Sequence, residues 1–303
     1  MTMNSKAGFV TILGLPNAGK STLLNALLGQ KLSITTNKPQ TTRKKILGIL
    51  SQDDYQIIFL DTPGILKPSY LLQEKMMNIV QKASRDADIY IYILDVDDDP
   101  EGDKLFAEEV IQSSLKTSKP KLLLLNKVDL SNQEKIKVLL KKFEEQKNID
   151  AVIPISASLA YNVSSALTAI IERLPDHPKY YPDDIIADAN ERFFVSEIIR
   201  EKVFELYQEE LPYSTEVIIA DFKEREAGKD LIRAEIVVEK ESQKGIIIGK
   251  HGDAIKRLGA SARKDIESFL QKGVFLDLRV KVRSKWRSSE NMLRSFGYSE
   301  PDD

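Results

Sequence analysis

Short apolar runs alternate with amphipathic stretches over the first 174 residues, and this alternation constrains the fold of that part of the chain. The apolar runs are expected strands, at residues 9–13, 46–50, 56–61, 89–96, 121–126 and 152–156. The stretches with helical periodicity are expected helices, at residues 20–28, 70–84, 104–115, 133–146 and 163–173. Continuous apolar strands separated by helices predict an α/β domain, a mostly parallel six-stranded sheet with helices on both faces.

A second pattern begins after residue 175. Residues 175–190 contain three prolines and many Asp and Asn residues without apolar periodicity, which predicts a domain linker. The elements expected beyond it are a helix at 193–208, strands at 216–222, 231–239 and 275–283, helical segments around 245–270, and a short helix near Glu290. The chain is therefore predicted to have an α/β domain at 1–175, a linker at 176–192 and an α+β domain at 193–303.

Composition excludes several kinds of chemistry. The 303 residues include no cysteine, so disulfides, thiolate nucleophiles, iron–sulfur centres and cysteine zinc sites are absent. The two histidines, His177 and His251, are far apart in sequence, which argues against a histidine-built metal centre. No apolar run is long enough to span a bilayer, and the N-terminus lacks the apolar core of a secretory signal, so we expect a cytoplasmic protein.

The residues Gly14–Ser21 match the pattern G-x-x-x-x-G-K-[ST] between the first expected strand and helix. Glycines allow such a loop to curl its backbone N–H groups toward phosphate oxygens at a helix N-terminus. Lys20 is expected to reach the β- and γ-phosphates, and the Ser21 hydroxyl to bind Mg²⁺. The candidate phosphate-site residues here are Gly14, Asn17, Ala18, Gly19, Lys20, Ser21 and Thr22.

Two further segments point to Mg²⁺ and a γ-phosphate. Asp61 ends an expected strand, where it can hold Mg²⁺ through water, and the N–H of Gly64 can contact the γ-phosphate. The polar segment 31–43 contains adjacent threonines, either of which can bind the metal through its hydroxyl. We favour Thr42 over Thr41, so the expected catalytic residues are Lys20, Thr42 and Gly64.

The sequence Asn126-Lys127-Val128-Asp129 ends another expected strand and indicates the base. One Asp129 carboxylate can accept hydrogen bonds from N1–H and the 2-amino group of guanine, whereas adenine has no such pair of donors. We expect Asn126 to bind the other edge of the purine and the Lys127 stem to cover its face. Backbone N–H groups of Ser156 and Ala157 are expected to contact the guanine oxygen. The domain is predicted to bind GTP.

The residue after Gly64 is Ile65, where many regulatory GTPases have a glutamine that orients the attacking water. Isoleucine cannot do this, so we predict slow intrinsic hydrolysis unless another group, an ion or a partner orders the water. Asn17 has two interpretations. It binds a monovalent cation such as K⁺ beside the phosphates, or it only stabilises the turn.

The second domain carries a localised basic segment. Residues 242–287 contain 12 basic and 4 acidic residues, a net charge of +8. Within it, Gly249-Lys250-His251-Gly252 separates two expected helices, the arrangement by which KH domains (here type II) clamp the backbone of single-stranded nucleic acid. The candidate RNA contacts are Gly249, Lys250, His251, Gly252, Lys256, Arg257, Arg283 and Lys285.

The strand that follows alternates cations with apolar residues, from Arg279 to Arg287. This alternation fits an RNA-binding face, and it also fits an edge strand whose charges prevent aggregation. Trp286, the single tryptophan, can stack on a base or pack in the core, and packing is the commoner role.

Over essentially its whole length, the chain resembles the Era family of bacterial and organellar GTPases. The resemblance rests on residues 14–21, 39–43, 61–64, 126–129, 156–157, 193–214, 245–252 and 285–298. The combination of GTPase motifs with a single C-terminal KH domain singles out this family. The resemblance implies binding of GTP, GDP and Mg²⁺, binding to the 3′ end of 16S rRNA, help in maturation of the small ribosomal subunit, and peripheral association with the inner membrane surface.

Two other functions are compatible with parts of the sequence. A kinase or ATPase could use the phosphate loop, but Asp129 argues against an adenine nucleotide. A signalling GTPase whose C-terminal module binds a protein partner is the second alternative, and the basic segment 242–287 disfavours it.

Overall fold

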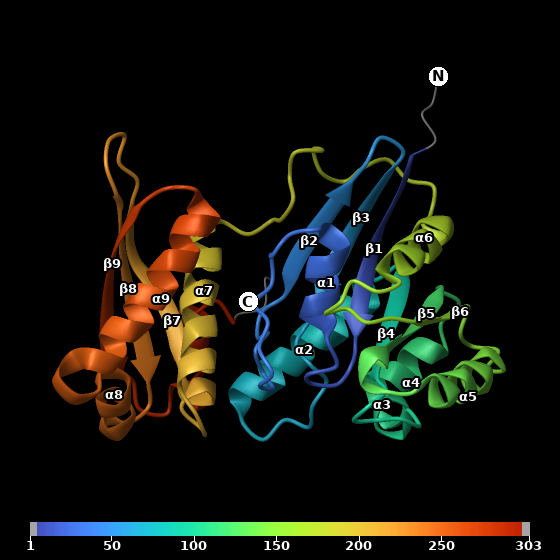
Figure 1. Ribbon diagram of the computed structural model, residues 1–303, viewed down its shortest axis with the longest axis horizontal. Coiled ribbons are helices and arrows are strands. Elements are labelled where there is room, and N and C mark those ends of the chain that lie inside the picture. Colours follow the sequence, from blue (N-terminus) through green and yellow to red (C-terminus); the bar gives the residue numbers. More distant parts are fainter. Residues whose placement is uncertain (1–4, 299–303) are drawn as a thin grey trace. The chain divides into compact units, whose positions relative to one another are not determined.

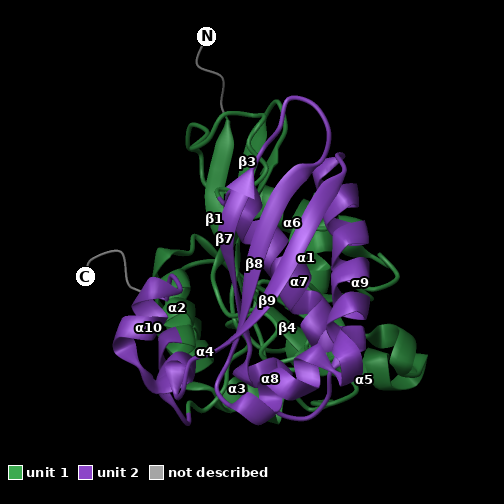
Figure 2. Cartoon of the chain, turned by 90° about the vertical axis from the view of Figure 1, so that its left-hand side faces the viewer, with its two compact units in different colours: residues 1–68, 76–188 green, residues 69–75, 189–303 purple. Residues whose placement is uncertain are grey.

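The structure is a computed structural model that describes residues 5–298, and these form two compact units (Figure 1). Unit 1 comprises the residues up to 68 and residues 76–188, and unit 2 comprises residues 69–75 and those from 189 onward (Figure 2). Buried apolar side chains form separate cores in the two units.

Unit 1 contains a six-stranded sheet in the order β2-β3-β1-β4-β5-β6. The strands are β1 (Lys6–Leu13), β2 (Ile46–Ser51), β3 (Tyr55–Asp61), β4 (Ile89–Asp95), β5 (Lys121–Asn126) and β6 (Ala151–Pro154). β2 pairs antiparallel with β3, whereas the other neighbouring strands are parallel. The predicted mostly parallel α/β sheet is confirmed.

Helices cover both faces of this sheet (Figure 1). They are α1 (Lys20–Leu28), α2 (Leu71–Asp86), α3 (Asp103–Ala107), α4 (Glu109–Leu115), α5 (Gln133–Glu144) and α6 (Val163–Arg173). Buried side chains of α1 and α6 pack on one face, and those of α2, α3, α4 and α5 pack on the other. Since the carboxyl ends of β1, β3, β4, β5 and β6 lie at one edge, the loops after these strands gather there.

The single helix expected at residues 104–115 is wrong. Glu108 has an extended backbone, with φ −70° and ψ 132°, and it divides the segment into α3 and α4. Both short helices still bury an apolar side chain, Leu105 in α3 and Ile111 in α4. Their apolar positions therefore continue the helical period across a break that the pattern does not reveal.

The segment expected to be a linker is bound to the sheet of unit 1 over much of its length. The N–H of Ile49 in β2 donates to the carbonyl of Ile186 at 2.9 Å, and Gly48 and Ala187 form an antiparallel bridge. The Gln56 side chain accepts from the N–H groups of Tyr180 and Tyr181 and donates to the Tyr181 carbonyl. Residues 180–187 thus cover the β2 edge of the sheet.

Unit 2 contains a three-stranded sheet in the order β7-β8-β9, in which β7 is antiparallel and β9 parallel to β8. Its elements are α7 (Glu191–Leu206), β7 (Glu216–Lys223), β8 (Asp230–Val238), α8 (Glu241–Ile248), α9 (Asp253–Leu270), β9 (Val274–Val282) and α10 (Glu290–Ser295). Buried residues of α7, α8 and α9 pack on the sheet. The expected α+β KH arrangement is confirmed.

The single tryptophan, Trp286, packs in the core near the end of unit 2. Trp286 is fully buried, and its indole N–H donates to the carbonyl of Ser214 at 2.9 Å. Its ring packs edge-on against Phe296. Of its two interpretations, the structure supports packing, because a fully buried ring has no face open to a nucleic acid base.

Candidate functional site

The loop between β1 and α1 has the backbone that a phosphate cradle requires. Asn17 and Gly19 both have positive φ, at 62° and 99°, which curls the chain just before α1 begins at Lys20. A Cβ on Gly14 would lie 2.5 Å from the Ile93 side chain, and one on Gly19 would collide with the Asn126 side chain. Only glycine fits at these two positions, so the loop can lie close to β4 and β5.

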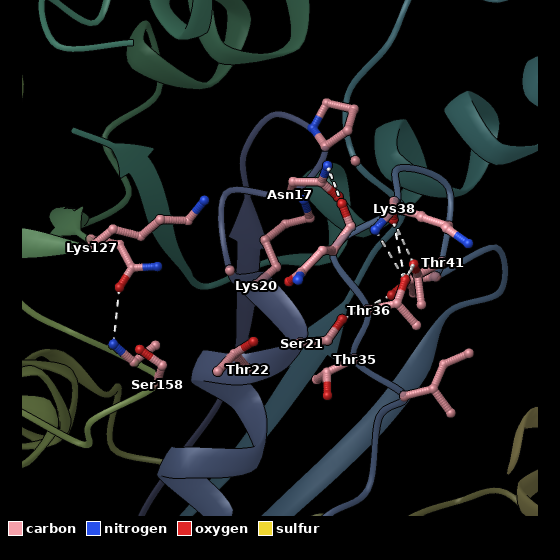
Figure 3. Close-up of a pocket in the computed structure, with 18 of the residues that line it drawn as sticks. Asn17, Lys20, Ser21, Thr22, Thr35, Thr36, Lys38, Thr41, Lys127 and Ser158 are labelled. Carbon is pink, nitrogen blue, oxygen red and sulfur yellow. Dashed lines mark hydrogen bonds between the residues drawn. The ribbon is translucent and has the colours of Figure 1, made fainter. Parts of the chain in front are cut away.

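The Lys20 side chain lies inside this loop (Figure 3). Its Nζ donates to the carbonyls of Gly14 and Leu15, at 3.1 and 2.8 Å. Burial lowers the pKa of Lys20 to about 8, although the nearby Asp61 charge opposes the shift. An ammonium group enclosed by carbonyl oxygens at a helix N-terminus is well placed to exchange those oxygens for phosphate oxygens.

Three predicted metal ligands converge beside Lys20. The Ser21 hydroxyl donates to Asp61 Oδ2 at 2.9 Å and lies 2.8 Å from the Thr42 hydroxyl. Asp61 Oδ1 is buried and has no hydrogen-bond partner within residues 5–298. Burial raises the pKa of Asp61, an effect that the Ser33 hydroxyl and Lys20 oppose.

These groups fit Mg²⁺, which binds oxygen ligands through one or two carboxylates together with waters and phosphate oxygens. Asp61 Oδ1, which has no hydrogen-bond partner among the described residues, would be available to accept a hydrogen bond from a metal-bound water. No cluster of three or more His, Cys, Asp or Glu among the described residues forms another metal site.

The two candidate threonines differ in what they contact. Thr41 Oγ1 lies 2.6 Å from Thr36 Oγ1 and donates to the Lys38 carbonyl at 2.7 Å, so it closes the loop on itself. Thr42 contacts Ser21 instead. The structure therefore brings Thr42, but not Thr41, into contact with Ser21, another predicted metal ligand.

A pocket of 490 Å³ extends from these groups to the predicted base-binding residues (Figure 3). Its walls come from the phosphate loop, from the segment around residues 34–42, and from the loops after β3, β5 and β6. A volume of this size suits a nucleotide. Several lining residues lie outside the predicted site residues, namely Ile34, Thr35, Thr36, Asn37, Lys38, Leu130 and Ser158.

Asn126 lines the pocket near the predicted base-binding residues and makes two hydrogen bonds within the protein. Its Nδ2 donates to the Ala18 carbonyl at 2.7 Å, and its Oδ1 accepts from the Ala157 N–H at 3.0 Å. Asn126 is 2% exposed. The side chain lines the pocket and also joins the phosphate loop to the loop after β6.

The expected backbone donors are engaged as well. The Ser156 N–H donates to the Tyr161 carbonyl, and the Ala157 N–H donates to Asn126. Ser156 does not line the nucleotide pocket, whereas Ala157 and Ser158 do. Position 158 simply continues the Ser156-Ala157 motif, so adjacency was the available signal for it.

Lys127 and Asp129, the predicted base-binding residues, both line the pocket. The Lys127 ammonium is 2.5 Å from Asp95 Oδ2, at the end of β4, and this ion pair fixes the direction of the aliphatic stem. Lys127 also has a positive φ of 64°, which starts the turn that carries Asp129.

Gly64 and Ile65 follow β3. Gly64 lines the pocket, and the Ile65 N–H donates to the Gly14 carbonyl at 3.0 Å, so this loop contacts the phosphate loop. The Ile65 side chain is 4% exposed and belongs to the apolar core. Its side chain is therefore packed among apolar residues of the core.

In unit 2, positive φ values at Gly249, His251 and Gly252 shape the loop between α8 and α9. A groove of 400 Å³ lies between α9 and β9. Its lining residues are Ile255, Lys256, Gly259, Ala260, Arg263, Leu276 and Leu278. Small residues, apolar side chains and two cations give this groove room for a base and charge for a phosphate.

The predicted RNA contacts are only partly gathered at this groove. Lys256 lines it, and Arg263 joins it although it was not among the candidates. Arg257 lies instead near Tyr207, where its charge opposes the rise that burial causes in the pKa of that tyrosine. Arg283 and Lys285 are exposed beyond the lining residues.

The cations of β9 are paired with acids. Arg279 lies 3.2 Å from Asp277, and Lys281 lies 2.6 Å from Glu235 on β8. This supports the edge-strand interpretation for these two residues.

Comparison with known proteins completes the description of the site. A family model described as "50S ribosome-binding GTPase" matches residues 9–127, and one described as "KH domain" matches residues 210–287. The chain is 45% identical to "GTPase Era" of Clostridium novyi over 97% of this chain and 99% of that one. It is 47% identical to "GTPase ERA1, chloroplastic" of Zea mays over 97% of this chain and 71% of that protein.

The chain is also similar to solved structures of Era. The chain matches a crystal structure of Era in complex with MgGDPNP and nucleotides 1506–1542 of 16S ribosomal RNA, with a TM-score of 0.91 and 36% identity over 98% of this chain and 100% of that one. It matches a single-residue variant of Aquifex aeolicus Era bound to GDP·AlF4⁻ with the same TM-score and identity, over 97% of this chain and 100% of that one.

Proposed function

Because the chain belongs to the Era family of GTPases, we propose that it binds the 3′ end of 16S rRNA under the control of GTP and assists maturation of the small ribosomal subunit. The observation that carries the proposal is the presence of two sites in one chain. Unit 1 holds the pocket lined by Ser21 and Thr42, with Asp61 hydrogen-bonded to Ser21, and unit 2 holds the groove between α9 and β9. The relative bound to nucleotides 1506–1542 indicates the class of RNA.

GTP hydrolysis follows from the residues of unit 1. Bound Mg²⁺ would neutralise charge on the β- and γ-phosphates. Lys20, held at the loop by two carbonyls, is positioned to take up phosphate oxygens in their place. The Gly64 N–H would contact the γ-phosphate, and Thr42 would contact both the metal and that phosphate; both residues line the pocket. Since Ile65 is in the core, the attacking water lacks a side chain from this position, and intrinsic hydrolysis is slow.

We propose that a monovalent cation helps to orient the attacking water. The Asn17 side chain donates to the Asn37 carbonyl at 3.1 Å, so it links the phosphate loop to the segment that carries Thr42. K⁺ bound beside Asn17 would lie next to the phosphates. Hydrolysis should therefore be faster in KCl than in NaCl, and Asn17→Ala should remove that difference. Equal rates of the parent protein in both salts would exclude K⁺.

For RNA, the proposed contacts are the backbone of the Gly249–Gly252 loop together with Lys256 and Arg263 in the groove. Both glycines have positive φ, and no atom lies within 4 Å of a Cβ built on Gly252, so this loop is open on that side. A phosphate can approach the backbone there, while the apolar wall of Ile255, Leu276 and Leu278 receives a base.

Control by GTP is proposed to pass through β2. This strand follows Thr42 by four residues, and residues 186 and 187 are hydrogen-bonded to it just before unit 2 begins. A change in the Thr42 segment on nucleotide exchange would reach residues 186–188 through β2. RNA and nucleotide would then alter one another's affinity by the same factor.

No helix among residues 5–298 is long and apolar enough to cross a membrane. We propose a cytoplasmic location from the sequence, and peripheral association with the inner membrane surface from the family resemblance.

The RNA proposal is tested with a labelled strand that copies nucleotides 1506–1542 of 16S rRNA. Gly252→Asp places a carboxylate in the loop and should weaken binding by more than about tenfold. Gly228→Asp is the matched control, because Gly228 also has a positive φ with no atom within 4 Å of its Cβ and lies in the β7–β8 loop. Failure of the parent protein to bind this RNA would favour a C-terminal module for a protein partner.

A further inference from the structure

Ser33 lies outside the motifs from which the nucleotide site was predicted, yet it contacts that site. It follows α1 at the start of the segment that leads to Thr42, and it is 1% exposed. Its hydroxyl donates to Asp61 Oδ2 at 2.9 Å. A buried hydroxyl that donates to a metal-associated carboxylate can control how that carboxylate is oriented.

The position of Ser33 is itself held by Asn25 on α1. Asn25 Oδ1 accepts from the N–H groups of Leu32 and Ser33, each at 2.9 Å. Asn25 Nδ2 donates to the Ser33 carbonyl at 2.8 Å. These three hydrogen bonds fix the backbone of residue 33 to the same helix that begins with the phosphate-binding Lys20.

The two oxygens of Asp61 are consequently used differently. Oδ2 accepts from both Ser21 and Ser33, whereas Oδ1 is buried and without a hydrogen-bond partner among the described residues. With Ser21 alone, the carboxylate could rotate about its single hydrogen bond. The second donor, from the opposite segment of chain, fixes the plane of the group.

We propose that Ser33 is a positioning residue for Mg²⁺, which acts by holding Asp61 so that Oδ1 faces a metal-bound water, and that Asn25 holds Ser33 in place. The inference rests on the nucleotide and Mg²⁺ site of unit 1. It assigns a role in metal affinity to residues that touch neither the metal nor the nucleotide.

The test is the affinity of the full chain for fluorescent mant-GDP, measured in excess MgCl2 and again in EDTA. The ratio of the two dissociation constants reports how much Mg²⁺ stabilises bound GDP. Ser33→Ala should reduce this ratio about tenfold, the usual effect of losing an outer partner of a metal ligand. Its affinity in EDTA should stay within about twofold of the parent, because no direct nucleotide contact is removed.

Ser114→Ala is the matched control. Ser114 is also buried in unit 1, at 2% exposed, and its hydroxyl is 2.7 Å from that of Tyr92, outside the pocket. This variant should lose stability without any change in the ratio. Asn25→Ala should lower the ratio as well, and combining it with Ser33→Ala should lower it no further than Ser33→Ala alone.

Different results would overturn different parts of this inference. An unchanged ratio in Ser33→Ala, or an equal loss of affinity in MgCl2 and EDTA, would show that Ser33 only supports the loop. If the two substitutions lowered the ratio additively in the double variant, Asn25 would not act through Ser33. If the GDP affinity of the parent protein were the same in MgCl2 and in EDTA, the proposed Mg²⁺ site of unit 1 would be refuted.

Discussion

Replacing Gly64 with alanine tests whether the loop after β3 must touch the phosphate loop for hydrolysis. A Cβ at position 64 would lie 2.7 Å from Cα and 2.8 Å from N of Pro16, which are backbone atoms that cannot swing aside. Ordinary contact begins at 3.4 Å, so the two segments must separate by about 0.7 Å. A hydrogen bond of about 2.9 Å from the Gly64 N–H to a γ-phosphate oxygen would then lengthen to about 3.6 Å and be lost.

A hydrogen bond to a charged acceptor contributes about 1.5–3 kcal/mol. Its loss in the transition state lowers the rate constant by about 10- to 150-fold. Single-turnover hydrolysis of GTP measures this effect. Affinity for mant-GDP should stay within about threefold of the parent, because GDP lacks the γ-phosphate.

Gly245→Ala is the control, since a Cβ on that residue of α8 has no atom within 4 Å. It should hydrolyse GTP like the parent. A Gly64→Ala protein that hydrolysed GTP within about twofold of the parent rate would refute the reasoning, because the contact with Pro16 would then carry no catalytic consequence.

Three further predictions use other residues. Asp129→Asn replaces an acceptor with an amide donor, so competition binding should show GTP affinity falling by up to about 10⁴-fold while xanthosine triphosphate, with a carbonyl at C2, becomes the better ligand. Trp286→Ala removes a fully buried ring and its hydrogen bond to Ser214, and urea unfolding should show a loss of about 3–5 kcal/mol. Ile65→Gln should not accelerate hydrolysis, because the side chain is in the core; it should lower the melting temperature instead.

Each of these three has a clear contradiction. Retained guanine preference in Asp129→Asn would move base recognition elsewhere. An unfolding free energy unchanged by Trp286→Ala would contradict its packing role. A faster Ile65→Gln enzyme would show that the loop after β3 turns position 65 toward the water.

The apolar runs predicted the strands of unit 1 because buried parallel strands need continuous apolar sequence. The ends of elements were harder to predict from sequence when they depend on backbone conformation. The break at Glu108 is an example, because it lies inside an uninterrupted helical period of apolar residues. Motifs likewise located the pocket, since loops after parallel strands gather at one edge.

The motifs could not predict contacts between side chains and partners that are distant in sequence. The use of Asn126 depends on Ala18, 108 residues away, and the burial of Trp286 depends on Ser214. In the sequence, Gln56 looks like an ordinary strand residue. In the structure, its side chain accepts hydrogen bonds from the N–H groups of residues 180 and 181, which attaches the expected linker to unit 1. Such contacts depend on the folded positions of both partners, which local patterns do not contain.

The central claim is that guanine nucleotide and RNA are coupled within one chain. The most direct test titrates the labelled strand that copies nucleotides 1506–1542 into the full chain saturated with GDP or with a non-hydrolysable GTP analogue. The account predicts that the RNA dissociation constant differs between the two nucleotides, and that RNA changes nucleotide affinity by the same factor. Tight RNA binding with identical constants in both nucleotide states would contradict it, since the two sites would then act independently.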